Sequence, residues 1–417
     1  MLLRSSWAAS GAVVLLAVPD ALVSATLLYV SSYAGNITTL RLRTGGTGTG
    51  AKSTHGSLEA VAWTTGCEPN PSWLTLDGSV LYCADEGLDA TNGTLSSFRT
   101  SKNGTLVQLD KVDTLSGPVS SVVYGDGGRG LAVAEYSGSS LSSFSKADPA
   151  ALTLTQTETF RLARPGPQAS RQDVPHPHEA LLDPTGQFLL VPDLGADLVR
   201  VFAVNQTSLG LTASTALVAA PGSGPRHAAF VVSPRDDDDN NNNRTRLYLV
   251  SELANTVTGY DVAYHDNNTL GFRQVYISGS HGLNQTVPSG AAAGEIHATP
   301  DAKYLILSSR NEASLSLANF DPANSTRLPS DALITFAVDH ATGGLTALQT
   351  FPAGGMVPRQ FSVSRAGDRL GVGLQADGRV VVIDRDVRTG LLTGFAASIP
   401  ITGNVTCVVF DEREEER

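Results

Sequence analysis

The stretch HEALLDPTGQFLLVPD, residues 178–193, decides how this chain folds. It reads as a short apolar strand, a turn of the Asp-Pro-Thr-Gly kind at 183–186, and a second apolar strand, Phe188–Asp193, that ends on an acidic residue. The turn assignment rests on Asp, Pro and Gly, which are common in turns. A third strand with alternating apolar residues follows at Leu198–Val204. Such a meander cannot bury both of its faces alone, so it must stack on neighbours of the same kind.

This unit recurs seven times, at intervals of about 50 to 65 residues. Second strands are expected to end near Ser32, Asp85, Glu135, Asp193, Glu252, Ser309 and Leu374. First strands are expected to begin near Pro71, Gly117, Pro177, Pro225, Gly294, Pro358 and Asn404. The chain opens on a second strand and closes on a first strand, so its two ends must share a blade. The sequence therefore predicts an all-β fold, a single seven-bladed β-propeller over residues 26–411, closed by pairing of the N- and C-terminal strands in one blade.

The composition fits a folded all-β chain. Apolar residues make up 41% of the sequence and charged residues 17%, and no stretch has the periodicity of an amphipathic helix. The net charge of −11 repels phosphate backbones and argues against nucleic acid as a partner. Part of that charge is local, in Asp236–Asp239 and in the charged C-terminal tail at 412–417. The segment 236–243 reads as a flexible loop within one hairpin, with a calcium site as the alternative.

The N-terminus predicts export. Residues 1–25 read as a signal peptide, with Arg4 before an apolar run at 7–18 and small residues at 23–25, and a signal anchor is the alternative. We expect a secreted monomer that is free of the membrane after cleavage. Glycosylation sequons support export independently, and they begin at Asn36, Asn92, Asn103, Asn205, Asn243, Asn267, Asn284, Asn324 and Asn404.

The three cysteines fit the same compartment. Cys67 and Cys83 flank one expected hairpin and are plausible disulfide partners in an oxidising environment. Cys407 lies in the apolar run 405–410, so we expect a buried free thiol rather than a nucleophile.

Propeller geometry predicts which residues share a rim. The first strand of a blade lines the channel and the second runs antiparallel beside it, so the start of one and the end of the other meet at the same mouth. Strand starts contribute Ser72, His178, Arg226, Glu295 and Arg359, and strand ends contribute Glu135, Asp193, Glu252, Arg310 and Gln375. A narrow mouth with imidazole, guanidinium and carboxylate groups favours perturbed pKa values and the binding of an anion.

Each candidate has a structural alternative. His178 could cap a strand turn, and Arg226 and Arg310 could be bridges to Asp193 or Glu252. Glu295, His297 and Arg359 could be structural, and His227 is expected to pack behind the channel wall. A metal held by His178, Glu252 and Glu295 is disfavoured, because these residues lie on separate blades without the spacing of metal ligands.

Five segments resemble the lactonase family of seven-bladed β-propellers, which includes 6-phosphogluconolactonase and carboxy-cis,cis-muconate cyclase. They are residues 177–197, Gly224–Phe230 with GPRHAAF, Ser251–Val257 with SELANTV, EIHATPD at 295–301 with LSSRN at 307–311, and PRQF at 358–361. The resemblance spans nearly the whole chain after the signal. It implies a catalytic set of His178, Arg226, Glu252 and Arg310, on the rim that strand geometry selects.

Together these observations favour lactone-ring chemistry without a cofactor or metal, on a small lactone or carboxylate. Arg226 and Arg310 are expected to stabilise developing charge, and His178 and Glu252 to move protons, while Asp193, Glu295, Arg359 and Gln375 bind substrate. Hydrolysis is the first hypothesis and a cyclase-type ring closure the second. A third, from another class, is a non-catalytic secreted propeller that binds a glycan or a protein.

Overall fold

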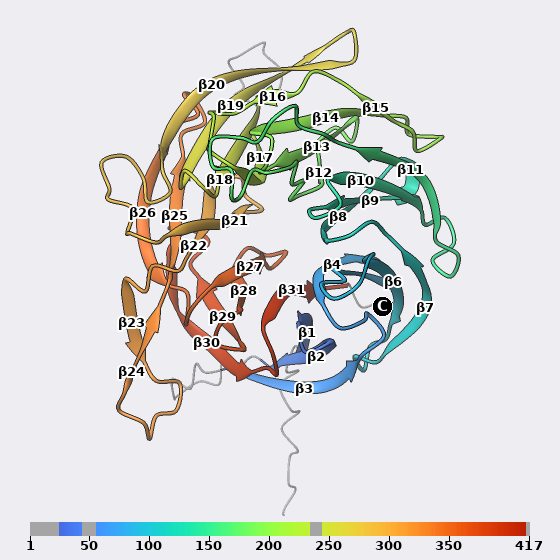
Figure 1. Cartoon of the computed structure of the whole chain (residues 1–417). Coiled ribbons are helices and arrows are strands. Elements are labelled where there is room, and N and C mark those ends of the chain that lie inside the picture. The colour runs from blue at the N-terminus through green and yellow to red at the C-terminus, as the bar shows by residue number, and fades with distance from the viewer. Residues whose placement is uncertain (1–24, 44–55, 234–243, 414–417) are drawn as a thin grey trace, which may run out of the picture.

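The computed structural model describes residues 25–43, 56–233 and 244–413. Within these ranges, seven antiparallel sheets stand around a common axis, and Figure 1 looks along that axis. The prediction of an all-β, seven-bladed propeller is therefore confirmed. The expected signal peptide up to residue 24, the loop at 236–243 and the tail from residue 414 lie outside the described residues.

The four main strands of each blade follow one another from the channel outwards. Blade 1 has β31 (Val405–Asp411), β1 (Ala25–Ser32), β2 (Asn36–Arg43) and β3 (Ser57–Thr64). Blade 2 has β4 (Pro71–Asp77), β5 (Val80–Asp85), β6 (Thr94–Thr100) and β7 (Leu106–Asp113). Blade 3 has β8 (Pro118–Tyr124), β9 (Gly130–Glu135), β10 (Ser140–Ser145) and β11 (Thr153–Thr159), with the short 3-10 helix η1 (Asp126–Gly128) between its first two strands.

Blade 4 has β12 (Leu181–Leu182), β13 (Phe188–Asp193), β14 (Leu198–Val204) and β15 (Leu211–Ala213), and β16 (Leu217–Val218) also pairs with β14. Blade 5 has β17 (Pro225–Val232), β18 (Thr245–Ser251), β19 (Thr256–His265) and β20 (Thr269–Gly279). Blade 6 has β21 (Ala292–Ala298), β22 (Tyr304–Arg310), β25 (Ala332–Val338) and β26 (Leu345–Pro352), and an inserted hairpin of β23 (Leu315–Ala318) and β24 (Arg327–Ser330). Blade 7 has β27 (Pro358–Val363), β28 (Arg369–Leu374), β29 (Arg379–Arg385) and β30 (Leu392–Pro400).

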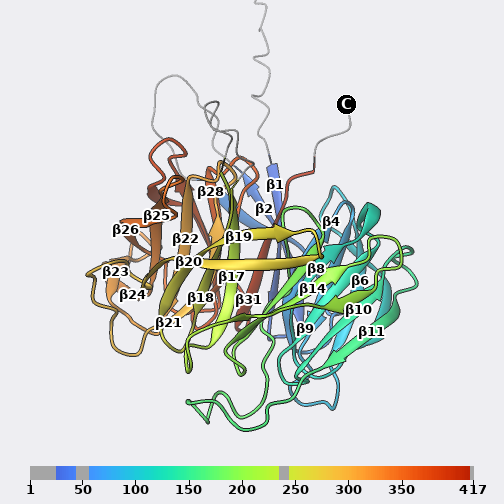
Figure 2. The same ribbon diagram turned by 90° about the horizontal axis from the view of Figure 1, so that it is seen from above.

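The ring closes in blade 1, as predicted. Strand β1 pairs antiparallel with β31, in a register that sets Leu27 opposite Asp411 and Val30 opposite Val408. Figure 2, which views the ring from above Figure 1, shows these two strands side by side. Because the first and last strands share one sheet, the ring has no free edge at the chain ends.

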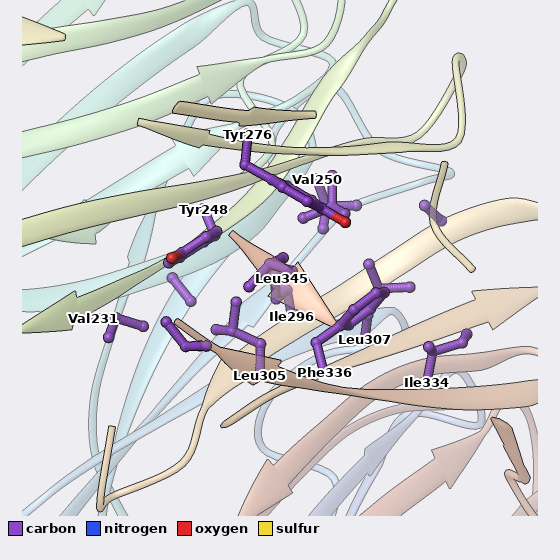
Figure 3. Close-up of a cluster of buried hydrophobic side chains, with 14 of the residues drawn as sticks. Val231, Tyr248, Val250, Tyr276, Ile296, Leu305, Leu307, Ile334, Phe336 and Leu345 are labelled. Atoms are coloured by element: carbon purple, nitrogen blue, oxygen red, sulfur yellow. The ribbon is translucent and has the colours of Figure 1, made fainter. Parts of the chain in front are cut away.

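The outermost strands of the blades are less buried than the strands nearer the channel. Every residue of β9, β13 and β18 is buried, whereas no residue of β7 or β11 is. Figure 3 shows the core between blades 5 and 6, where Val231, Tyr248 and Val250 pack with Ile296 and Phe336. Fully burying a side chain of this kind contributes about 1.5–3 kcal/mol, so these clusters hold each blade against the next.

A β-bulge near the start of the innermost strand recurs in six blades. A bulge bends the strand and re-aims the extra residue, which is Arg226 in blade 5 and Arg359 in blade 7. Side chains near the bulges also join neighbouring inner strands: Ser72 Oγ donates to Pro118 O at 2.6 Å, and Thr406 Oγ1 donates to Pro71 O at 2.6 Å. These two bonds join the inner strand of blade 2 to those of blades 3 and 1.

The cysteine predictions are confirmed. Cys67 and Cys83 form a disulfide that ties the segment before β4 to β5, and Cys407 is a buried free thiol on β31. In the described ranges, no helix is long and apolar enough to cross a bilayer.

Candidate active site at the channel mouth

One rim of the channel is built from two positions that recur from blade to blade. The first is the bulged residue of the inner strand. The second is the residue after the second strand, whose N–H donates back to the segment before the inner strand: Glu252 to Gly224 O at 2.8 Å, Tyr136 to Gly117 O at 2.6 Å and Glu86 to Asn70 O at 3.0 Å. The two positions lie at the same edge of each sheet, so residues far apart in sequence share one mouth.

Glu252 is the centre of an ion cluster at this mouth. Its Oε2 accepts from Arg226 Nε at 3.1 Å and lies 2.8 Å from Arg310 Nη2, while its Oε1 accepts from Arg171 Nη2 at 2.8 Å. Burial alone would raise the pKa of this carboxyl, but the three guanidiniums outweigh burial and hold the pKa far below its usual range. Glu252 is therefore an anion and a weak base at neutral pH, which favours a role in orienting the arginines over the proton-moving role expected from the sequence.

The two inner arginines are fixed by backbone as well as by Glu252. Arg226 is only 2% exposed, and its Nη1 donates to Gly294 O at 2.8 Å, across the gap from blade 5 to blade 6. Arg310 donates to Ala292 O at 3.2 Å and to Ala293 O at 3.0 Å. Burial and the neighbouring Arg310 lower the pKa of Arg226 to about 9, so it is charged at neutral pH. Three guanidiniums around one carboxylate leave net positive charge for an anionic ligand.

His178 adjoins this cluster from blade 4. Its backbone N–H donates to Pro192 O at 2.8 Å, and its ring packs edge-on against Tyr136 at 5.5 Å between centroids. Burial, and next the charge of Arg226, lower the pKa of His178 well below its usual value. The imidazole is therefore neutral at pH 7, the state that a general base requires.

A second ion pair contributes to the same mouth. Arg359 of blade 7 lies 3.4 Å from Glu86 Oε1, and Tyr33 hydrogen-bonds to the same carboxylate. The charge of Arg359 also lowers the pKa of His178. The structure thus places Arg359 at the mouth in an ion pair with Glu86, and its role in substrate binding stays a prediction.

The structure brings together His178, Arg226, Glu252 and Arg310, with Arg359 beside them, and separates the other predicted substrate-binding residues. Asp193 is fully buried and accepts from Arg200 Nε at 2.8 Å and from the N–H groups of His176 at 2.7 Å and Ala196 at 3.0 Å. This carboxylate is occupied by the protein, so we assign it a structural role in place of substrate binding. Glu295 is also buried, and its carboxylate faces His227 rather than the mouth. Gln375 lies in the turn after β28 and is half-buried.

Two residues of the site were missed from the sequence. Arg171 comes from the segment between β11 and β12, which has no repeat counterpart, so nothing in the period indicated it. Tyr136 lies beside Arg171, and its ring stacks on that of His176 with 4.2 Å between centroids. It follows Glu135 as Glu252 follows Ser251, and comparison of these positions could have found it.

Among the described residues, no three His, Cys, Asp or Glu side chains are arranged so that they could hold a metal ion. The groups assembled at the mouth are one neutral imidazole, one carboxylate and several guanidiniums. Such a set can accept a proton from water and stabilise an oxyanion.

Comparisons with known proteins agree with this architecture. The family model described as lactonase, 7-bladed beta-propeller, matches residues 27–410. A probable 6-phosphogluconolactonase of Arthroderma benhamiae is 32% identical over 332 residues, which cover 79% of this chain and 77% of the relative. A 6-phosphogluconolactonase of Formosa agariphila is 26% identical over 347 residues, covering 82% of this chain and 88% of the relative.

Solved structures give the same result. The periplasmic gluconolactonase of Pseudomonas aeruginosa superposes with a TM-score of 0.73 at 27% identity, covering 93% of this chain and 99% of that chain. A putative 6-phosphogluconolactonase of Bacteroides fragilis superposes with a TM-score of 0.73 at 25% identity, covering 94% of this chain and 100% of that chain. The protein is therefore a β-propeller of the lactonase type. The chain belongs to the lactonase family of seven-bladed β-propellers.

Proposed function

We propose that this protein is a lactonase that hydrolyses an anionic sugar lactone at the channel mouth, without a cofactor. The observation that carries the proposal is the juxtaposition of a neutral, buried His178 with two guanidiniums held on Glu252. The names of the relatives, 6-phosphogluconolactonase and gluconolactonase, support sugar lactones as the substrate class.

The chemistry begins with water activation. A water at the mouth gives a proton to the His178 imidazole while its oxygen attacks the lactone carbonyl. The neutral imidazole is ready for this step at pH 7, whereas Glu252 is a poor base because three guanidiniums stabilise its anion.

The negative charge then develops on the carbonyl oxygen. Arg226 and Arg310 are held by Glu252 and by backbone carbonyls, so they need little rearrangement as the oxyanion forms. The ring opens when the carbon–oxygen bond of the tetrahedral intermediate breaks. The imidazolium, made a strong acid by burial, returns its proton to the departing alkoxide.

The net charge of the arginines favours a substrate with a further anionic group. Among the described residues, the Arg226 bonds use Nε and Nη1, which leaves Nη2 for a ligand. Arg359 could bind a phosphate or carboxylate at the other side of the mouth.

The test is a hydrolysis screen of purified protein on gluconolactone, 6-phosphogluconolactone and carboxymuconolactone. Hydrolysis is measured as acid release at constant pH. We expect turnover of a sugar lactone and its loss in Arg226→Gln. If no lactone is hydrolysed, the result would favour the alternative of a non-catalytic propeller that binds a glycan or a protein. Turnover of carboxymuconolactone alone would favour the cyclase-type alternative.

We also propose that the protein is secreted and glycosylated. The disulfide between Cys67 and Cys83 supports an oxidising compartment. The described sequon asparagines support glycan attachment, because Asn92, Asn103, Asn205, Asn267, Asn284, Asn324 and Asn404 are exposed and Asn36 is half-buried. The test is expression in a secreting host: we expect the chain in the medium and a mass shift on enzymatic deglycosylation. Retention in the cytosol without glycans would contradict the proposal.

A further inference from the structure

Beneath the mouth lies a buried group of ionisable side chains that the mechanism above does not use. His227, on β17 next to Arg226, is 1% exposed, and its Nδ1 lies 2.8 Å from Glu295 Oε1 of blade 6. Glu179 of blade 4 approaches the same Nδ1 at 3.8 Å, while its Oε2 accepts from Ala228 N at 2.7 Å. Three blades thus place an imidazole between two carboxyl groups inside the channel.

His227 reaches across the channel. Its ring lies 5.7 Å from that of Trp73, which belongs to β4 of blade 2, and 5.2 Å from that of His178. It therefore contacts both the opposite wall and the proposed base. The prediction from the sequence that His227 packs behind the channel wall is therefore wrong.

The hydrogen bonds fix which nitrogen of His227 is free. An ionised carboxylate only accepts, so the bond to Glu295 requires the proton on Nδ1 and leaves a lone pair on Nε2. Nε2 of His227 and Nδ1 of His178 are both buried and have no partner within the described structure. Two neighbouring imidazoles, each with one buried nitrogen that lacks a partner, can share a proton through one water.

We propose that the Glu295–His227 pair is a positioning pair that holds the proton which His178 gains and loses in lactone hydrolysis. This inference rests on the proposed function and deepens it. When the attacking water gives a proton to Nε2 of His178, the Nδ1 proton of His178 moves to Nε2 of His227. The imidazolium of His227 then faces the Glu295 carboxylate. The proton returns by the same path to the departing alkoxide, so no proton is gained or lost overall.

The electrostatics of the channel support this task. Burial lowers the pKa of His227 to about 4, so the ring is neutral at neutral pH and its Nε2 carries no proton. Burial, and next the charge of Glu295, raise the pKa of Glu179 well above its usual value, so the negative charge is favoured on Glu295 over Glu179. The charged or titratable groups around the two rings are Arg226, Arg359, Glu179, Glu295, His297, Cys407 and Tyr136.

The test uses Glu295→Gln, which keeps the shape of the side chain and removes its charge. The first readout is the titration midpoint of His178, measured by NMR on the full chain with labelled histidines. The His178 signal is identified by its absence in His178→Asn. Loss of a nearby anion disfavours imidazolium, so we expect the midpoint to fall by about half a unit to one unit. This measurement needs no substrate.

The second readout is kcat against pH. In Glu295→Gln we expect kcat to fall about tenfold with KM nearly unchanged, and the acid limb to move to lower pH in step with His178. His227→Asn retains a donor toward Glu295 but lacks Nε2, so it should lower kcat about as much. Circular dichroism establishes that each variant folds.

Gln360→Ala is the matched control. Gln360 follows the bulge in blade 7 as His227 does in blade 5, and its Oε1 accepts from Val408 N at 2.7 Å, so its loss removes a bond between blades without touching the histidines. We expect lower stability and an unchanged midpoint. If Glu295→Gln leaves the His178 midpoint in place, or shifts it no more than Gln360→Ala does, the pair is only structural. A protein that shows the shift but hydrolyses no lactone would overturn the proposed function and leave the coupling supported.

Discussion

Replacing Glu252 with Gln is the sharpest test of the site, because it removes one charge and almost no volume. Glu252 is 7% exposed and faces Arg226 at 2% and Arg310 at 11% exposure. Removing one partner of a buried ion pair costs about 3–5 kcal/mol, because the other charge remains buried and unpaired. The third partner, Arg171, is 44% exposed and adds little in comparison. The Gln oxygen still accepts one hydrogen bond, so we expect a loss near the lower limit, about 3 kcal/mol.

The assay is urea unfolding at pH 7, with tryptophan fluorescence as the probe of the folded state. Glu86→Gln is the matched control, because Glu86 is 11% exposed but faces one guanidinium, Arg359, at 3.4 Å together with the Tyr33 hydroxyl, so it should lose less stability than Glu252→Gln. Added sulfate should stabilise Glu252→Gln more than the wild type, since the arginines at the mouth then carry one more uncompensated positive charge, which favours binding of an anion. A loss of stability in Glu252→Gln no greater than that in Glu86→Gln, or equal stabilisation of the variant and the wild type by sulfate, would show that Glu252 does not balance the arginines.

Three further predictions concern catalysis, pH and the disulfide. His178→Asn should lower kcat for a sugar lactone by about 10²–10⁴-fold with an unchanged circular dichroism spectrum, and a variant as fast as wild type would exclude His178 as the base. The pKa of Glu252 is lowered on folding, so its contribution to stability is complete above its ordinary value of 4.5 and is lost only as pH falls through the lower folded value. Acid titration of stability should therefore show the difference between wild type and Glu252→Gln persisting at pH 4.5 and closing only well below it, whereas closure above pH 5 would contradict the assignment. Replacing Cys67 and Cys83 with Ser opens a loop with a sequence separation of 16 and should cost about 3 kcal/mol in urea unfolding, and an unchanged midpoint would show that the bond adds nothing.

Much of the fold could be predicted from the sequence because each blade is encoded locally. Turn residues such as those at 183–186 end one strand and start the next, and the repeat places seven such units in order. Strands β1, β5, β9, β13 and β28 end at the residues that the repeat predicts. The same regularity selected His178, Arg226, Glu252 and Arg310, because a residue's place in the repeat determines its rim.

What the repeat does not contain is the identity of each side chain's partners. Arg171 lies in an irregular segment and reaches Glu252 only in the folded ring. Asp193 and Glu252 occupy neighbouring positions of the repeat, yet the first is held by the protein and the second faces the arginines. The position of a residue in the repeat therefore predicts which rim of the channel its side chain lies on, but not what that side chain does there.

The sequence by itself thus determined a closed ring of sheets and placed four side chains, His178, Arg226, Glu252 and Arg310, at one mouth, since strand, turn and period are local properties of the chain. Only the tertiary structure decided which carboxyls have a lowered pKa and which a raised one, and that His227 lies against His178 inside the channel. The physical reason is that charge state and hydrogen bonding depend on burial and on neighbours from other blades, which no local stretch of sequence specifies.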